Sequence, residues 1–484
     1  MSAPNVASQI QISACQKDIY SDEINWSDNV CIRDGMIYGT IDLSRHKSSR
    51  KINVSVEIIN CTIFGDVELG NAHFSKDVCF QKTTFSKAAN FGGSNFSQSV
   101  DFRDVVFMKK ASFNDIKIYG ASDFNGSRFK EDAIFGDDNI NRTTFVGNFG
   151  FIDAVIGGES LFKNTNFFGT AIFNNSTFKG ITHFENANFS KQASFLEATF
   201  EDKSYFNGAN FFELVCFAMT RFNQACEFYD PLKGAAIFWG NANFVRSKFS
   251  EDTNFQRTHF KKNANFTQAE FERDWNLDNV NFESGLSMNG CNFNNIKVSW
   301  DSIDQLEFDG SVYLNLIKNF KNNEKFDEAD RCYSQYRRLS QGKKGYLDPT
   351  FYTDFVAYAT CSYGTSVSII IIWVAILIII GAYLLWRSKG LEIEIDHHVG
   401  HDEKRGHCER YERNPNSFES IRVNSNTSAS WRKCLYFSAA MFIGYKPEKI
   451  HAQGSSEYIA MGLRLVGWFF MALCLVVFGR LMIR

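Results

Sequence analysis

The sequence predicts a β-solenoid followed by a helical neck and an α-helical membrane domain with two spans. Three observations lead to this fold class: a phenylalanine repeat over the first three fifths of the chain, two long apolar runs near the C-terminus, and a half-length apolar run between them. The expected segments are an N-terminal cap (1–52), a β-solenoid (53–308), a helical neck (309–345), a membrane-entry helix (346–365), a first span (366–386), an outer loop (387–430), a half-length helix with its loop (431–450), and a second span with a basic tail (457–484).

The repeat is the strongest signal, because 50 of the 484 residues are phenylalanine. From Phe74 the aromatic positions alternate in steps of five and six, which gives a period of 11 residues per pair. Neither an amphipathic helix nor a simple strand meander has this period. Small residues such as Ala89 and Ser94 stand two positions before Phe91 and Phe96 and leave room beside each ring. The pattern predicts stacked coils in which each short side buries one large side chain.

This repeat resembles the pentapeptide-repeat family, in the variant with phenylalanine at the central position, over residues 53–308. The resemblance implies a right-handed quadrilateral β-helix. Four sides of about 5.5 residues then give about 22 residues per coil and roughly 11 to 12 coils. Residues 51–300 contain 24 Lys and Arg against 28 Asp and Glu. This balance is too mild for mimicry of DNA, and we expect no nucleic-acid partner. A rigid scaffold or spacer is the simplest role.

Two apolar runs predict membrane spans. Residues 366–386 carry no charge and are long enough to cross a bilayer, and the second run is interrupted only by Arg464. The basic cluster around Arg337 and Arg338 precedes the first span, and Arg480 and Arg484 follow the second. The N-terminus lacks the features of a signal peptide. The positive-inside rule then predicts a multi-pass plasma-membrane protein with two spans, whose solenoid and C-terminus are cytosolic.

The segment between the spans, "WRKCLYFSAAMFIGY" (431–445), is apolar for about 10 residues, which is too short to cross the bilayer but suits a re-entrant helix. The order of span, re-entrant helix, glycine turn and span resembles the two-transmembrane pore domain of the potassium-channel superfamily over residues 350–484. "CSYG" (361–364) resembles the entry motif of bacterial and archaeal proteins that join this pore to pentapeptide repeats. The resemblance implies a homotetramer that conducts monovalent ions, with filter residues Phe442, Ile443, Gly444, Tyr445 and Lys446.

This filter departs from the pattern of the family. Phe442 stands where the family has threonine, and Lys446 replaces the second glycine. Lysines at the outer mouth would repel cations. Non-selective, weakly anion-favouring and rarely open pores therefore all remain open. Gly467 in the second span is either a gating hinge or a helix-packing glycine.

The outer loop contains a histidine-rich cluster, listed as His397, His398, His401, His407 and Cys408. The cluster is either a weak metal or pH-sensing site or an ordinary solvated loop. Cys408 and Cys434 would face the same side and are candidates for a disulfide. We find no nucleotide-binding glycine loop, no HExxH and no GxSxG, so we expect no enzyme activity and no cofactor.

Two functions remain open from the sequence. In the first, the protein is an oligomeric ion channel in the lipid bilayer, whose cytosolic β-helix regulates the pore or binds an unknown cytosolic protein or ligand. In the second, it is a membrane-anchored β-helix scaffold for a cytosolic protein, with a membrane domain that does not conduct. The half-length segment favours the first function, and Phe442 and Lys446 favour the second.

Overall fold

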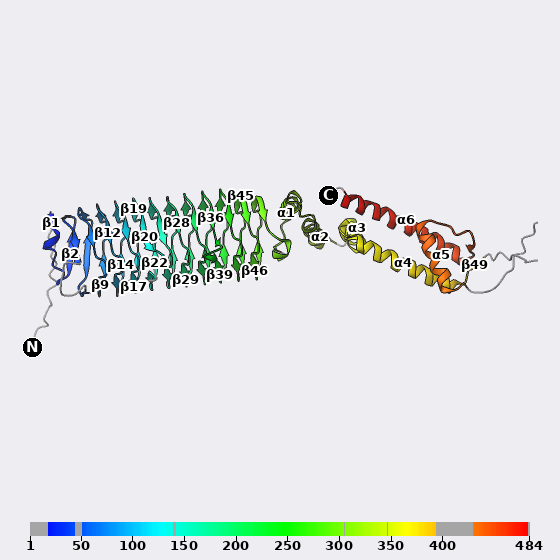
Figure 1. Cartoon of the computed structure of the whole chain (residues 1–484), viewed down its shortest axis with the longest axis horizontal. Coiled ribbons are helices and arrows are strands. Elements are labelled where there is room, and N and C mark those ends of the chain that lie inside the picture. Colours follow the sequence, from blue (N-terminus) through cyan, green and yellow to red (C-terminus); the bar gives the residue numbers. More distant parts are fainter. Residues whose placement is uncertain are drawn as a thin grey trace, which may run out of the picture. The chain divides into compact units, whose positions relative to one another are not determined.

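The computed structural model describes residues 18–43, 51–138, 142–303, 305–345, 347–393 and 429–482. The chain divides into two compact units, one up to Cys332 and one from Tyr333 onward, and each is described by itself. The first unit is a stack of short parallel strands, closed by α1 (Gly310–Asn322) and the beginning of α2 (Phe326–Gly342). The second contains the rest of α2 and the helices α3 to α6 (Figure 1).

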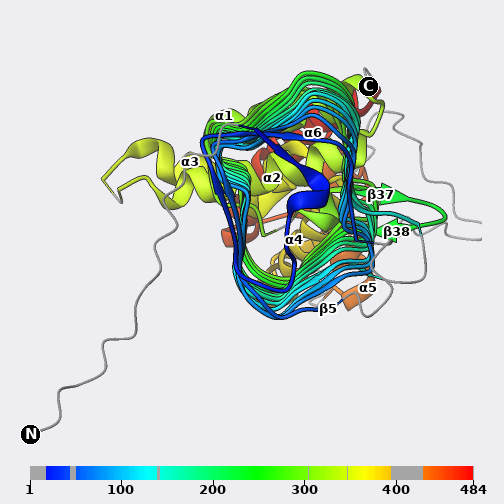
Figure 2. The same ribbon diagram turned by 90° about the vertical axis from the view of Figure 1, so that its left-hand side faces the viewer.

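The first unit is a four-sided β-solenoid, as its end-on view shows (Figure 2). One coil consists of β30 (Ala193–Ser194), β31 (Thr199–Phe200), β32 (Ser204–Tyr205) and β33 (Asn210–Phe211). Strands pair in parallel with the strand 22 residues further along, for example Asn188 with Asn210. One side is a 12-stranded sheet from β2 (Val30–Arg33) to β47 (Leu286–Ser287), which gives about 12 coils. The predicted coil length and number are confirmed.

The other sides belong to two further sheets. An 11-stranded sheet runs from β5 (Lys51–Ile52) to β46 (Asn281–Phe282), and a 23-stranded sheet covers the remaining two sides from β1 (Asp18–Tyr20) to β45 (Glu270–Asn276) and β48 (Asn292–Lys297). Most strands are only two residues long, because each side of a coil is short. The backbone hydrogen bonds therefore run along the solenoid, from each coil to the next.

The core consists of four columns of phenylalanine rings, one behind each side. Their rings stack with centroid distances of 4.7 Å for Phe195–Phe217, 4.9 Å for Phe200–Phe222, 5.1 Å for Phe206–Phe228 and 5.0 Å for Phe211–Phe238. Small buried hydroxyls lie between the columns and bond to the preceding coil. Ser94 Oγ, for example, donates to the Leu69 carbonyl over 2.6 Å. The predicted inward rings and small neighbours are both present.

The corners have a regular backbone geometry. Every eleventh residue along most of the solenoid adopts a left-handed conformation, as at Asn164, Asn175 and Asn186 (φ between 53° and 56°). Asparagine tolerates this conformation better than most residues with a side chain. The alternating steps of five and six residues therefore reflect corners of different turn geometry.

Two coils are longer than the others, since Ser122 pairs with Phe149 and Val215 pairs with Ala242, 27 residues apart. The second insertion is a hairpin of β37 (Tyr229–Asp230) and β38 (Gly234–Ala235), which projects from the coils (Figure 2). Its Lys233 Nζ lies 2.9 Å from the buried carboxylate of Glu185. Such insertions interrupt the phenylalanine rhythm without breaking the stack.

The parallel ladders begin earlier than the expected boundary at residue 53. β2 pairs with β6 (Val56–Ile59), and β1 pairs with β3 (Met36–Tyr38), which in turn pairs with β7 (Thr62–Ile63). The inward positions of these coils hold Ile32, Ile37 and Ile41. Aliphatic side chains fill the same space, so the phenylalanine rhythm alone misses the first coils.

The C-terminal end of the solenoid is covered by α1. Its apolar face buries Val312, Leu316 and Phe320. Its Asn319 side chain accepts a hydrogen bond from the Ile296 N–H (3.1 Å) and donates one to the Ile296 carbonyl (2.8 Å). The helix thus satisfies the exposed edge of β48 as well as its apolar surface. This agrees with the expectation of a helical cap, and the break after Asn322 is also where the sequence predicts it.

The second unit is helical. α3 (Pro349–Cys361) begins at the N-cap Asp348 with proline in its first turn, and a short turn η4 (Ser362–Gly364) leads into α4 (Val367–Ser388). α5 (Trp431–Ile443) and α6 (Ser455–Met482) follow the outer loop. α4 and α6 are the two helices among the described residues that are long and apolar enough to cross a membrane. β49 (Leu391–Ile393) pairs antiparallel with β50 (Ile450–Ala452) between them.

Candidate functional site

The candidate site is the three-helix arrangement of α4, α5 and α6. α5 packs against both long helices through two apolar clusters. The first contains Leu385, Phe437 and Leu463, and the second contains Ile370, Phe442 and Phe470. Both clusters lie between helices of one chain, so the half-length helix is held from two sides.

Small residues bring the three helices close together. A Cβ atom at Gly381 of α4 would lie 2.5 Å from both Ser438 Oγ and Leu463 Cδ2. The buried Ser438 Oγ donates to the Ile378 carbonyl of α4 over 2.8 Å. A Cβ atom at Gly467 of α6 would lie 1.9 Å from the Phe442 carbonyl oxygen. Glycine and serine at helix contacts are typical of membrane helix packing.

The predicted filter residues divide between the helix and the turn that follows it. Phe442 and Ile443 form the last residues of α5. Gly444 ends the helix in a left-handed conformation with φ +86°. Its N–H donates to the Met441 carbonyl (3.0 Å), and the Tyr445 N–H donates to the Ala440 carbonyl (2.8 Å), which is a Schellman ending. The first two residues expected in a filter loop are therefore helical.

Their side chains differ in exposure. Phe442 is buried, with its ring centroid 6.4 Å from that of Phe470. Ile443, Tyr445 and Lys446 are exposed in the single chain. Burial of Phe442 against α6 explains why the helix continues to this residue, where the resemblance placed an extended backbone. The exposed side chains follow directly at the turn.

The other predicted residues are placed as follows. Gly467 lies against the Phe442 carbonyl within a continuous α6, the position expected of a packing glycine. Cys434 is buried, with its Sγ 3.7 Å from the Ala429 carbonyl. The cluster of His397, His398, His401, His407 and Cys408 lies outside the described residues, and so does any pairing of Cys408 with Cys434.

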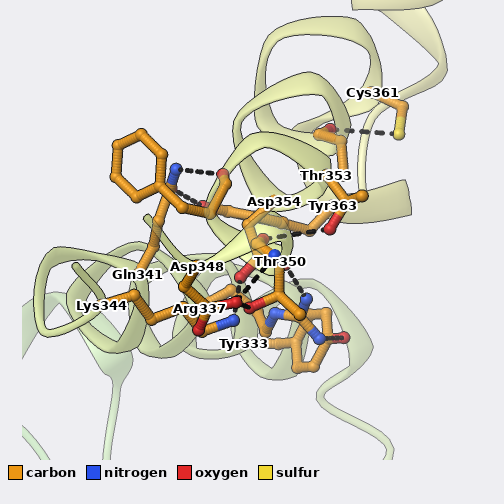
Figure 3. A network of polar contacts seen from close by, with 12 residues as sticks. Tyr333, Arg337, Gln341, Lys344, Asp348, Thr350, Thr353, Asp354, Cys361 and Tyr363 are labelled. Carbon is orange, nitrogen blue, oxygen red and sulfur yellow. Dashed lines mark hydrogen bonds and ion pairs between the residues drawn. The ribbon is translucent and has the colours of Figure 1, made fainter. Parts of the chain in front are cut away.

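A polar network that sequence reasoning did not identify lies where α2, α3, η4 and the end of α6 meet (Figure 3). The carboxylate of the buried Asp354 forms ion pairs with Arg337 and with Lys344, the latter at 2.6 Å. The hydrogen bonds from Lys344 and Arg337 hold the pKa of Asp354 below its ordinary value. The Arg337 guanidinium also lies over the Tyr363 ring at 5.5 Å.

The "CSYG" stretch supplies the strained part of this network. Ser362, Tyr363 and Gly364 are three successive residues with positive φ (49°, 58° and 83°). Such a backbone costs of order 1 to 3 kcal/mol at each non-glycine position. In return, the Tyr363 hydroxyl donates to Gln341 Oε1 (2.8 Å), and Arg480 Nη1 donates to the carbonyls of Tyr363 and Gly364 (both 3.3 Å). The motif thus holds the end of α6 against α2. Its sequence signal was the motif itself, but not its partners.

Comparison with known proteins identifies the repeat. Residues 69–117 and 235–281 match the family model described as pentapeptide repeats (nine copies). No curated protein and no solved structure matches the chain. The matched segments lie on regular coils near both ends of one continuous ladder. The N-terminal part of the chain is therefore a pentapeptide-repeat β-solenoid domain, joined to a helical C-terminal region with two long apolar helices.

Proposed function

We propose that the protein is an oligomeric ion channel of the plasma membrane, with the β-solenoid as its cytosolic regulatory or scaffold domain. The observation that carries this proposal is the position of α5. Its 13 residues extend about 20 Å, too short to cross a bilayer, yet it packs between two helices that are long enough. A helix that ends inside the membrane requires a polar or protein-filled space beyond its last residue.

The depth of the α5 end supports this reading. Gly467, which contacts the Phe442 carbonyl, is 12 residues from the start of α6 and 15 from its end. The Gly444 turn would thus lie near the middle of the span. One chain supplies one such turn, so several copies are needed to enclose a pore, and the resemblance to two-transmembrane channels suggests four.

The surfaces of α4 and α6 fit a membrane protein. Ile371 and Ile372 of α4 and Leu475 and Val476 of α6 are more than half exposed in the single chain. Lipid tails and neighbouring copies would cover these side chains. α3 also exposes Tyr352, Phe355 and Val356 on one helix face, which suits a position at the membrane surface ahead of the first span.

Recordings from purified full-length protein in planar bilayers test the proposal. We expect unitary currents from the wild type and from Gly454→Asp, because that glycine has open space around it. Gly444→Asp should abolish the currents without changing the size of the oligomer in detergent. Absence of current from a correctly assembled wild type, over a range of voltages, pH values and salts, would refute the channel function.

A second candidate function, a membrane-anchored scaffold, is favoured by one face of the solenoid. The outward residues on five coils of the 11-stranded sheet carry no charge: Thr144, Val146, Asn166, Phe168, Asn188, Ser190, Asn210, Phe212, Ile237 and Trp239. Phe212 and Trp239 stack at 6.0 Å, and the Asn188 amide donates to Asn166 over 2.9 Å. Aromatic side chains without neighbouring charge are typical of the centre of a protein interface. An assembled but non-conducting protein would favour this function.

A further inference from the structure

Arg464 is the only charged residue of α6 between Glu457 and Arg480. It lies nine residues after Ser455 and sixteen before Arg480, or about 14 Å and 24 Å along the helix axis. If α6 spans the bilayer, the guanidinium group is within the hydrocarbon layer. Ionisable residues at this depth are rare and usually face a water-filled cavity or a partner.

The described part of the chain does not supply that partner. Arg464 Nη2 lies 3.8 Å from Met441 Sδ, and a thioether is only a weak acceptor. Arg464 Nε is buried and has no hydrogen-bond partner among the described residues. The side chain forms no ion pair within those residues, and α4 contains no acid. An unpaired buried cation is costly, so the site requires an acceptor from outside the chain.

This unpaired cation lies beside the turn that ends α5. Gly467, one helical turn after Arg464, contacts the Phe442 carbonyl, and Trp468 Nε1 lies 3.2 Å from the Cβ position of Gly444. The exposed Lys446 follows this turn. The loop from Gly444 to Ile450 contains Lys446 and Lys449 against the single acid Glu448, so its net charge is positive.

We propose that the pore admits small monovalent anions, with Arg464 and Lys446 as the groups that attract them. The inference rests on the proposed channel function and names its ion class. Around a symmetric pore, each residue would form a ring of positive charge. In a site that excludes water, such charges attract anions and repel cations more strongly than they do in bulk solvent. An anion would also provide the acceptor that the Arg464 guanidinium lacks.

The test is the sign of the reversal potential of full-length protein in bilayers with a KCl gradient. We expect a chloride-to-potassium permeability ratio above one for the wild type. Arg464→Gln and Lys446→Gly should each lower this ratio by roughly tenfold, the equivalent of about 1.4 kcal/mol of lost attraction. Lys433→Gln is the matched control, since it removes an exposed cation about 16 Å from Gly444 along α5 and should leave the ratio unchanged.

The outcomes separate the two proposals. A current that favours potassium overturns the anion inference and leaves the channel function intact, whereas absence of current from an assembled oligomer refutes the channel function. Arg464→Lys keeps the charge and should retain the anion preference, which covers the case in which Arg464→Gln fails to assemble. If Arg464 instead binds a lipid phosphate, neutral and charge-retaining substitutions will give the same permeability ratio, and this result overturns its role.

Discussion

Gly467 sets the distance between α5 and α6. A methyl group at this position would lie 1.9 Å from the Phe442 carbonyl oxygen, which belongs to the backbone and cannot rotate away. The two helices would have to separate, and with them the second apolar cluster, in which Phe442 packs against Phe470. The residue therefore acts on the whole three-helix arrangement through one contact.

Gly467→Ala should destabilise the membrane domain by about 1 to 3 kcal/mol, the usual cost of an overpacked interior. Gly462→Ala on the same helix is the control, because no atom lies within 4 Å of a Cβ at that position. The measurement is the midpoint of heat-induced loss of the oligomer in detergent. Equal midpoints for the two variants would show that α5 and α6 do not pack as described.

At the scale of elements, α1 is the part of the molecule that closes the solenoid. The last strand, β48, presents backbone groups with no following coil to pair with, and Asn319 bonds to both the N–H and the carbonyl of Ile296. The remaining surface is covered by apolar side chains of the same helix. A single amide thus performs the pairing that the next strand would otherwise provide.

Asn319→Leu should destabilise the solenoid by about 2 kcal/mol or more, because a buried N–H and a buried carbonyl lose their partners. Asn315→Leu introduces the same change at an exposed position of α1 and should have little effect. Urea unfolding followed by circular dichroism in the β region compares the two. A similar midpoint for both variants would contradict the capping role of Asn319.

The elements also differ in how far the sequence predicts them. The phenylalanine columns follow from spacing alone, because every coil repeats the same burial and the same backbone pairing. The first coils use isoleucine at the inward positions, so the rhythm does not reach them. β49 and β50 have no local signal, since each is three residues long and its partner is more than 50 residues away. The end of α5 depends on burial of Phe442 against α6, which a local likeness does not contain.

At the scale of the whole molecule, the chain combines a rigid repeat domain with a membrane-type helical region. The network of Arg337, Asp354, Tyr363 and Arg480 ties α2 and α3 to the last turn of α6. Sequence reasoning found the motif "CSYG" but not this network, because its members are up to 117 residues apart. If α6 lines a pore, any movement of α2 would reach its end through these contacts.

The predicted topology places both termini on the cytosolic side and the turn after α5 nearer the outer surface. In a Cys408→Ser background, a membrane-impermeant maleimide should label Lys446→Cys in intact cells, because that side chain is exposed beyond the Gly444 turn. Tyr20→Cys, on the exposed surface of the first coil, should be labelled only after the membrane is permeabilised. Labelling of Tyr20→Cys in intact cells would place the solenoid outside and reverse the orientation that the positive-inside rule predicts. Labelling of both without permeabilisation would show that α4 and α6 do not cross the membrane as a pair.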